Sequence, residues 1–184
     1  LEPSLFARKQ TYAVFGHPIG HSKSPLIHEQ FAMQIQRDIK YLRIQPSLDG
    51  FAAILTQFFA LGGQGANITI PFKLNAYQLC QQLSSRARLA GAVNTVWQDE
   101  GVLCGDNTDG AGLVRDLLAQ GITLNGASIL LLGAGGAARG VAPEQVVEID
   151  EALAQSLQAD RVIELHQRGI GQGLRRAGLL DALG

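Results

Sequence analysis

The chain has 184 residues, of which 46% are hydrophobic and 17% charged, so it can bury a globular core. Its formal net charge is -1 and it has no run of Lys or Arg, which disfavours nucleic-acid and anionic membrane partners and favours a small molecule. Residues 1–10 lack the apolar segment of a signal peptide, and the most apolar stretch, 51–61, is too short to span a bilayer. The two cysteines, Cys80 and Cys104, argue against a disulfide framework and favour a reducing compartment, which points to the cytoplasm.

Strands and helices are predicted to alternate through the first part of the chain. Hydrophobic periodicity and Gly/Pro punctuation give a strand at 12–15, a helix at 25–36 with Ser24 as its N-cap, a strand at 41–44, a helix at 48–61 and a strand within 65–73. Ile27, Phe31 and Ile35 recur at helical spacing, which predicts an amphipathic helix. This alternation predicts an α/β fold with a mostly parallel sheet and helices on its faces.

The stretch 65–73, G-A-N-I-T-I-P-F-K, has the features of a binding site. In a strand, Asn67 and Thr69 share one face while Ala66, Ile68 and Ile70 share the other. Pro71 ends the strand and a lysine, Lys73, follows at its carboxyl end, where open α/β sheets bind ligands. The alternative interpretation is an edge strand followed by a solvated lysine.

Ser22 and Ser24 lie at the predicted beginning of the first helix. Free backbone N–H groups and the helix dipole favour an anion there, such as a carboxylate. Simple helix capping is the alternative explanation for Ser24. His17, His21 and His28 lie in the same region, but no carboxylate or thiolate completes a metal-ligand set, so no metal site is predicted.

Two polar clusters follow a predicted helix at 74–83. The first contains Asn94 in a strand at 92–97, and the second is G-D-N-T-D-G at 105–110, after a short strand that a turn joins to the first. The second cluster does not match a calcium-binding loop, because its carboxylates have the wrong spacing and no closing glutamate follows. Asp109 is expected to cap a helix at 110–120, and Asp106 is assigned to a turn outside the site.

A buried-type strand at 128–132 runs into a glycine-rich loop. Gly133, Gly135 and Ala138 fit the G-x-G-x-x-G/A pattern between a strand and a helix, where backbone N–H groups can approach a pyrophosphate. Pro143 shortens the following helix. Beyond it, the sequence supports only weaker elements: a strand at 146–149, a helix at 150–158, a strand at 162–165 and a glycine-punctuated basic tail.

Five motifs in this order resemble the shikimate dehydrogenase family over about residues 12–141: S-K-S-P, N-I-T-I-P-F-K, G-A-V-N-T, G-D-N-T-D-G and L-L-L-G-A-G-G-A-A-R-G. The resemblance implies an NADP-dependent oxidoreductase that reversibly reduces 3-dehydroshikimate to shikimate in chorismate and aromatic amino-acid biosynthesis. It implies that Ser22 and Ser24 hold the substrate carboxylate and that Thr69, Asn94 and Asp109 bind its ring hydroxyls. Lys73 and Asp109 would form the catalytic pair, with the lysine ammonium donating a proton to the C3 oxygen.

The resemblance also implies two domains, a shikimate-binding catalytic domain at 1–108 and a linking helix with an incomplete Rossmann-like domain at 109–184. NADP would bind the glycine-rich loop through Gly133, Ala134, Gly135, Gly136 and Ala137. Family motifs for the 2′-phosphate and the later substrate contacts are not visible after Val141. A non-catalytic shikimate-binding remnant and an NAD-dependent quinate/shikimate dehydrogenase, with Asp150 on the ribose, therefore remain alternatives. A homodimer is left open.

Overall fold

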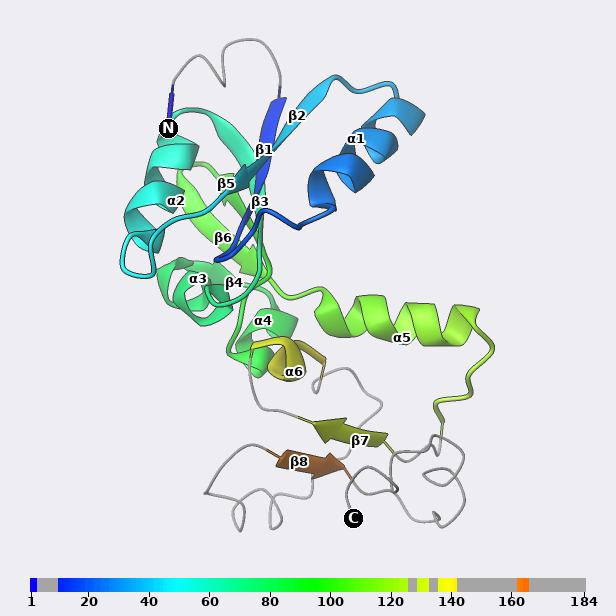
Figure 1. The fold of residues 1–184 in the computed structure, drawn as a ribbon. Coiled ribbons are helices and arrows are strands. Elements are labelled where there is room, and N and C mark those ends of the chain that lie inside the picture. Colours follow the sequence, from blue (N-terminus) through cyan, green and yellow to red (C-terminus); the bar gives the residue numbers. More distant parts are fainter. Residues whose placement is uncertain (3–9, 126–128, 133–135, 142–161, 166–184) are drawn as a thin grey trace.

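The computed structural model describes residues 1–2, 10–125, 129–132, 136–141 and 162–165 (Figure 1). Helices and strands alternate along most of this part of the chain, as an α/β fold requires. In chain order they are β1 (Gln10–Phe15), α1 (Ser24–Gln34), β2 (Ile39–Ile44), α2 (Phe51–Ala60), β3 (Gly63–Ile68), α3 (Lys73–Leu79), β4 (Gln82–Leu83), α4 (Ser85–Ala90), β5 (Thr95–Asp99), β6 (Val102–Asp106), α5 (Asp109–Ala119), β7 (Ile129–Leu132), α6 (Gly136–Val141) and β8 (Val162–Leu165).

A six-stranded sheet with the order β2-β1-β3-β5-β6-β4 forms the larger body. The pairs β1–β2, β1–β3 and β4–β6 are parallel, whereas β5 runs antiparallel to β3 and β6. The sheet is therefore mixed, although the α/β class is confirmed. The cause is the tight turn between β5 and β6, where Glu100 and Gly101 take φ values of 47° and 83° and reverse the chain within two residues.

The side chains of β1 alternate between two hydrophobic clusters, one on each face of the sheet. Ala13 and Phe15 join the larger cluster under α2, where Phe15 meets Phe51 and Phe58 edge-on with ring centroids 6.1 and 5.6 Å apart. Val14 joins the smaller cluster on the α1 side. Figure 1 shows α1 and α2 on opposite sides of these strands. Because apolar side chains of β1 point alternately to both faces of the sheet, each face offers an apolar surface for a helix to cover.

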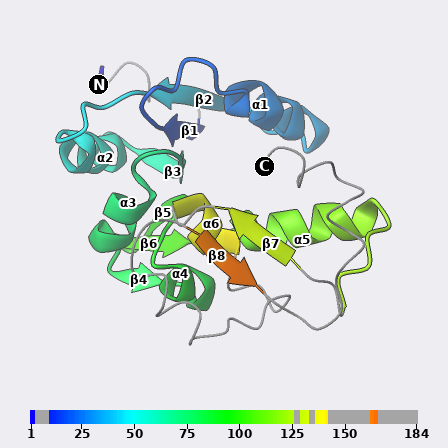
Figure 2. The same ribbon diagram turned by 60° about the horizontal axis from the view of Figure 1, so that its bottom comes forward.

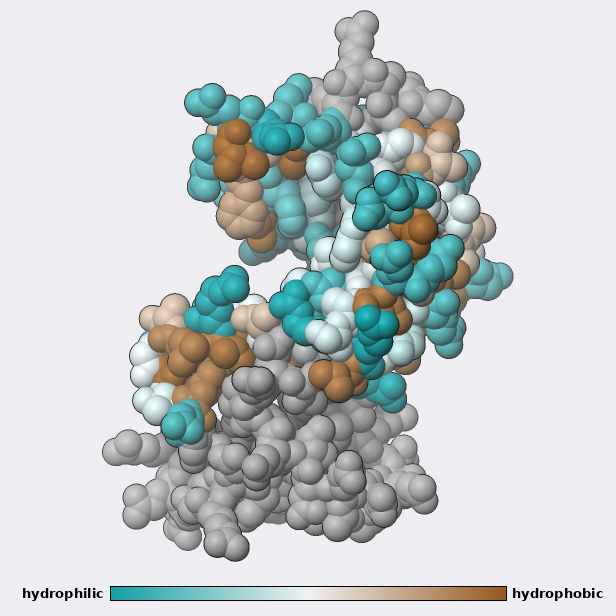
Figure 3. All heavy atoms as spheres, turned by 180° about the vertical axis from the view of Figure 1, so that it is seen from behind, coloured by the Kyte–Doolittle hydropathy of each residue, from teal (hydrophilic) through white to brown (hydrophobic). Residues whose placement is uncertain are grey.

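The apolar stripe of the predicted amphipathic helix does not face the core. Ile27, Phe31 and Ile35 are 43%, 55% and 69% exposed, and α1 buries only Pro25 and Ala32. The helix contacts β1 and β2 through this narrow side and through His28, which stacks on the Tyr41 ring, so the larger apolar side chains are left on the outside. In Figure 3 hydrophobic surface is visible over α1 at upper left and over α5 at lower left.

The region after α5 contains a strand pair and a short helix. The strand predicted at 162–165 is confirmed as β8, which pairs with β7 in antiparallel register, unlike the parallel strands of a dinucleotide-binding half. The helix α6 packs against α4 and α5 (Figure 2). The elements predicted at 146–149 and 150–158, the ribose candidate Asp150 and the loop residues 133–135 lie outside the described residues. Within the described residues, no helix is long and apolar enough to cross a membrane.

Candidate active site

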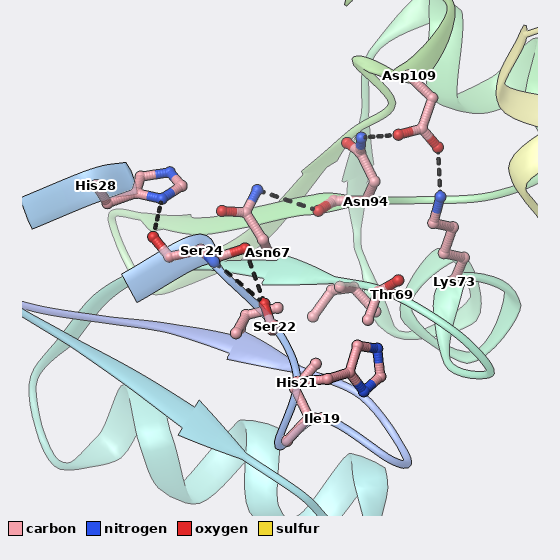
Figure 4. Close-up of a pocket in the computed structure, with 12 residues that line it drawn as sticks. Ile19, His21, Ser22, Ser24, His28, Asn67, Thr69, Lys73, Asn94 and Asp109 are labelled. Carbon is pink, nitrogen blue, oxygen red and sulfur yellow. Dashed lines mark hydrogen bonds and ion pairs between the residues drawn. The ribbon is translucent and has the colours of Figure 1, made fainter. Parts of the chain in front are cut away.

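A cavity of about 350 Å³ opens at the carboxyl ends of β1 and β3 (Figure 4). The helices α1, α3 and α5 each begin beside it and contribute a polar side chain from their first turn. Its lining combines hydroxyl, amide, imidazole and charged groups with a few apolar side chains: Val14, Ile19, His21, Ser22, Ser24, His28, Asn67, Ile68, Thr69, Lys73, Asn94 and Asp109. All six side chains predicted to bind substrate or act in catalysis line this one cavity.

Lys73 and Asp109 form an ion pair on one side of the cavity. Each is the first residue of its helix, α3 and α5 respectively, and the Nζ of Lys73 donates a hydrogen bond to Oδ2 of Asp109. The side chains are only 13% and 26% exposed. A lysine ammonium held by one carboxylate oxygen in this position can donate a proton to a bound molecule, and the carboxylate keeps the ammonium oriented.

Asn94 holds the carboxylate of Asp109 in place. Its Nδ2 donates to Oδ1 of Asp109 at 2.7 Å and to Oγ1 of Thr108 at 3.0 Å. Its Oδ1 accepts from the Thr108 N–H at 3.0 Å and from Oγ1 of Thr95 at 2.8 Å. An amide has two donor hydrogens and two acceptor lone pairs, so these contacts use the whole side chain within the protein.

The expectation that Asp109 caps α5 is wrong. The N-cap is Thr108, which makes no side-chain capping bond, and Asp109 begins the helix itself. Its carboxylate instead bonds Lys73 and Asn94, while its N–H donates to Oδ1 of Asn107 at 3.1 Å. The negative charge in the first turn still suits the helix dipole, so the position is favourable to the helix as well as to the ion pair.

The two serines lie across the cavity from the ion pair (Figure 4). The prediction of Ser24 as N-cap is wrong by one residue: Lys23 is the N-cap, it makes no side-chain capping bond, and Ser24 begins α1. The Ser22 hydroxyl oxygen accepts the Ser24 N–H at 3.3 Å, and the two hydroxyl oxygens are 3.1 Å apart. Two hydroxyls and a helix N-terminus thus face the same space, which suits a carboxylate.

Asn67 lines the cavity but was not assigned to the site from the sequence. Its Oδ1 accepts a hydrogen bond from the Tyr41 hydroxyl, and burial raises the pKa of Tyr41 above its ordinary value, so the phenol remains a donor. Its Nδ2 makes only long contacts, 3.5 Å to the Asn94 carbonyl and 3.5 Å to Oγ1 of Thr95. The period-two pattern that placed Asn67 beside Thr69 on one face was the signal that could have identified it.

Thr69 reaches the cavity because the backbone beside it is a glycine. A Cβ on Gly16 would lie 2.7 Å from Cγ2 of Thr69 and 3.2 Å from the Ile70 carbonyl oxygen. The strand β3 ends at Ile68, and Ile70, predicted to share a face with Ala66 and Ile68, is 68% exposed. The Thr69 N–H still donates to the Phe15 carbonyl at 2.9 Å, so backbone pairing with the end of β1 and the close approach to Gly16 together position Thr69.

Two of the histidines in this region, His28 and His17, have structural contacts. His28 stacks on the Tyr41 ring with centroids 4.2 Å apart, and its Nδ1 lies 2.8 Å from the Ser24 carbonyl oxygen. A carbonyl only accepts, so Nδ1 of His28 is the donor. His17 makes the corresponding contact to the Pro46 carbonyl at 2.8 Å. In the part of the chain that the structure describes, no group of His, Cys, Asp and Glu side chains could hold a metal ion.

Asp106 lies outside the cavity, as predicted from the sequence. Its carboxylate accepts hydrogen bonds from the Ser84 hydroxyl, the Arg86 guanidinium and the Asn107 N–H. Burial opposes the ionisation of Asp106, but these hydrogen bonds and the Arg86 charge outweigh it and lower its pKa below the ordinary value of 3.8. Asp106 therefore ties α4 to the end of β6.

A lowered pKa makes Asp106 a source of acid sensitivity. The ionised carboxylate stabilises the fold above the ordinary pKa of 3.8, and this contribution is lost as the pH falls through the lower pKa of the folded state. We expect urea unfolding between about pH 5.5 and pH 3 to show a smaller loss of unfolding free energy for Asp106→Asn than for the unmodified chain. Identical pH dependence in both proteins would contradict this role.

Cys80 and Cys104 are free, buried thiols. Burial, with a smaller contribution from Cys104, raises the pKa of the Cys80 thiol to about 12, so Cys80 remains protonated and unreactive at neutral pH. A Cβ on Gly105 would lie 2.7 Å from the Cys80 sulfur, which shows how tightly this thiol is packed. Both cysteines therefore belong to the core rather than to the site.

Comparisons with known proteins identify this arrangement. Residues 14–96 match the family described as the shikimate dehydrogenase substrate binding domain. That range contains the serines, Asn67, Thr69, Lys73 and Asn94. Residues 14–96 thus match the substrate-binding domain of shikimate dehydrogenases. The resemblance proposed from the sequence motifs is therefore confirmed, and the matched range contains every residue that lines the cavity except Asp109.

Individual relatives extend the match. The chain is 57% identical over 143 residues to the NADP(+) shikimate dehydrogenase of Aeromonas hydrophila, which covers 77% of this chain and 52% of that protein. It is 53% identical over 169 residues to the Aeromonas salmonicida enzyme of the same name, an alignment that covers 86% of this chain and therefore extends beyond residue 141, and 60% of that protein. The chain thus spans roughly half the length of the curated relatives it matches.

Solved structures agree with this assignment. The shikimate 5-dehydrogenase of Thermus thermophilus, solved in complex with shikimate, superposes with a TM-score of 0.67 at 39% identity and covers 72% of this chain and 50% of that one. The shikimate dehydrogenase of Aquifex aeolicus gives a TM-score of 0.70 at 35% identity and covers 73% of this chain and 51% of that one. The superposed part is again about half of each neighbour.

Proposed function

We propose that this chain carries the substrate-binding and proton-transfer half of an NADP-dependent shikimate dehydrogenase, which reversibly reduces 3-dehydroshikimate to shikimate in chorismate and aromatic amino-acid biosynthesis. The observation that supports this proposal best is the Lys73–Asp109 ion pair, which shares one cavity with Ser22 and Ser24 on its other side. A ring that carries a carboxylate on one side and a reactive carbonyl on the other can contact the two serines and the ion pair at the same time. We expect the enzyme to act in the cytoplasm, and residues 1–108 to form the substrate domain.

Each polar group in the cavity has a proposed task. The hydroxyls of Ser22 and Ser24, at the beginning of α1, bind the substrate carboxylate. Thr69 and Asp109 contact the ring hydroxyls, and Asn94 contributes mainly by fixing Asp109, because its amide is already occupied. Asn67 adds a side-chain N–H whose present contacts are long, and this donor can turn to a hydroxyl of the ring.

Lys73 is the proposed proton donor and acceptor. When the C3 carbonyl is reduced, negative charge develops on its oxygen, and the Lys73 ammonium donates a proton to that oxygen while Asp109 holds the ammonium in line. In the reverse direction the neutral amine accepts the hydroxyl proton. Bound NADPH supplies the hydride, and this chemistry belongs to the cofactor.

The glycine-rich segment is the proposed place for NADP. Its members Gly133, Ala134 and Gly135 lie outside the described residues, whereas Gly136 and Ala137 begin α6. In the sequence the glycine-rich segment stands between β7 and α6, which is the strand-to-helix setting of a pyrophosphate loop, and α6 reaches the Asp109 carboxylate at Gly140. This contact supports a nicotinamide cofactor near the ion pair, with the glycine-rich segment proposed to bind its pyrophosphate.

A non-catalytic shikimate-binding protein is the second candidate. It is favoured by β8, which pairs with β7 in antiparallel register instead of the parallel register of a dinucleotide-binding half. On this alternative the cavity binds shikimate but no turnover follows, because the described residues after α5 include no parallel strand to bind the adenosine half of the cofactor. The two candidates share the pocket and differ only in the cofactor.

The pocket can be tested without turnover. We expect calorimetry to detect shikimate binding to the unmodified chain, and substitution of both Ser22 and Ser24 by Ala to weaken it about 10- to 100-fold or more, because hydrogen bonds to a carboxylate are lost. Ser85→Ala, at an exposed position that begins α4, is the matched control and should bind normally. Absence of binding heat together with absence of competition by 3-dehydroshikimate would contradict the proposed function.

A further inference from the structure

Gly140 in α6 lies directly against the ion pair of the site. A Cβ built on Gly140 would stand 2.6 Å from Oδ1 and 2.9 Å from Nδ2 of Asn107, and 3.0 Å from Oδ2 of Asp109. The last atom is the oxygen that accepts the hydrogen bond from Lys73. Carbon atoms do not approach oxygen this closely, so a methyl group at residue 140 must displace one of these side chains.

Asn107 has little freedom to move away from such a methyl group. It is 1% exposed, its Nδ2 donates to the Ala92 carbonyl at 3.0 Å, and its Oδ1 accepts the Asp109 N–H at 3.1 Å. Its own N–H donates to Oδ1 of Asp106 at 2.7 Å. A shift of Asn107 would leave buried polar groups unpaired, which is costly, so the displacement would pass to Asp109.

Helix propensity does not explain a glycine at residue 140. Alanine is better than glycine within a helix by up to about 1 kcal/mol, and Gly140, the penultimate residue of α6, is not among the described glycines with the positive φ of a C-terminal cap. Its neighbour α5 contains a glycine in the opposite situation: a Cβ on Gly112 would meet no atom within 4 Å. The contact with Asn107 and Asp109 is therefore the feature that distinguishes Gly140.

We propose that Gly140 and Asn107 are positioning residues for the Lys73–Asp109 pair, which seat the helix after the glycine-rich loop directly on the carboxylate. This inference rests on the proposed function, because it assigns the pair a task that needs exact placement. Asn107 holds the Asp109 backbone from β6, and the bare backbone of Gly140 closes the space behind the carboxylate oxygen. The cofactor segment and the proton-transfer pair are thus in contact through one residue without a side chain.

The test compares Gly140→Ala with Gly112→Ala. In Gly140→Ala we expect shikimate affinity to fall about 10-fold or more, since Asp109 and its hydrogen bonds are displaced. The side-chain amide resonance of Asn94, which reports its bond to Asp109, should shift in the ¹⁵N–¹H spectrum. In Gly112→Ala both readouts should match the unmodified chain, and its thermal unfolding temperature should be equal or higher.

If Gly140→Ala folds, it is combined with Asn107→Ala, which removes the two atoms nearest the new methyl group, so the affinity loss of the double variant should be smaller than the two single losses combined. If Gly140→Ala fails to fold, Asn107→Ala alone is the test: it removes the acceptor of the Asp109 N–H, so shikimate affinity should fall and the Asn94 side-chain amide should shift. An unshifted Asn94 amide in folded Gly140→Ala, or strictly additive losses, would overturn the inference. If the unmodified chain does not bind shikimate, the proposed function fails, and the Asn94 resonance alone decides the positioning role.

Discussion

Replacement of Lys73 by alanine is expected to lower kcat for shikimate oxidation by about 10²- to 10⁴-fold, with a much smaller change in KM. A proton donor or acceptor acts mainly in the transition state, where the charge on the C3 oxygen changes, so its loss affects turnover more than binding. Growth of NADPH absorbance with shikimate and NADP⁺ measures both constants. The carboxylate of Asp109 remains in the variant but has no ammonium to orient.

Two further variants separate catalysis from simple charge loss. Lys40→Ala removes a lysine from β2, outside the residues that line the cavity, and should leave both constants unchanged. Asp109→Asn keeps the shape of the side chain but weakens the hold on the Lys73 ammonium, so kcat should fall here as well. Turnover by Lys73→Ala at the rate of the unmodified chain would remove Lys73 from the mechanism.

Local sequence pattern predicted much of the fold because polar and apolar residues alternate along the strands and Gly or Pro residues mark the ends of the helices. The strand predicted at 162–165 is β8, and the helix predicted to end before Gly62 does so, with Gly62 at φ 97°. The exposed stripe of α1 could not be predicted in this way. Helical spacing of Ile27 and Phe31 indicates a helix, but it does not specify which face other elements cover.

The residues of the candidate site were predicted from family motifs and not from their spacing in the sequence. Lys73 and Asp109 are 36 residues apart, and no periodic pattern relates them. Both occur in motifs of the family, and the fold places both in the first turns of helices around one cavity. Helix capping was a reasonable local expectation for Asp109, but a lysine on a neighbouring helix competes for the same carboxylate. Tertiary partners of this kind are not encoded in local sequence pattern.

Asn107 and Gly140 illustrate what the motifs left unexplained. Both belong to motifs that supported the family resemblance, yet neither was assigned a task from the sequence. Their significance lies in a contact between the end of β6 and a helix that begins about thirty residues later, as a Cβ on Gly140 would meet Asn107 at 2.6 Å. A glycine required by a long-range contact has the same appearance in a sequence as one required by a turn.

The part of the chain after α5, proposed to bind the cofactor, departs most from a complete dinucleotide fold. Within the described residues it consists of β7, α6 and β8, and β8 pairs antiparallel to β7. The parallel strand that normally follows the glycine-loop helix, and whose end reads the ribose and its 2′-phosphate, is not among the described elements. Leu113, Leu118 and Ile122, in and just after α5, are exposed beside this region.

We therefore expect this chain to bind NADP⁺ weakly and to discriminate poorly between NADP⁺ and NAD⁺. A lost charge-assisted clamp on the 2′-phosphate costs about 1.5–3 kcal/mol, which is about 10- to 100-fold in affinity, and loss of the adenine surface adds to this. Turnover should be low unless a partner chain completes the domain. Titration of both nucleotides against the purified chain, with ADP and 2′-phospho-ADP-ribose to isolate the adenosine end, measures the effect. Micromolar, phosphate-selective binding of NADP⁺ would show instead that the residues after Val141 rebuild the site, a result compatible with the Aeromonas salmonicida alignment that extends past that residue.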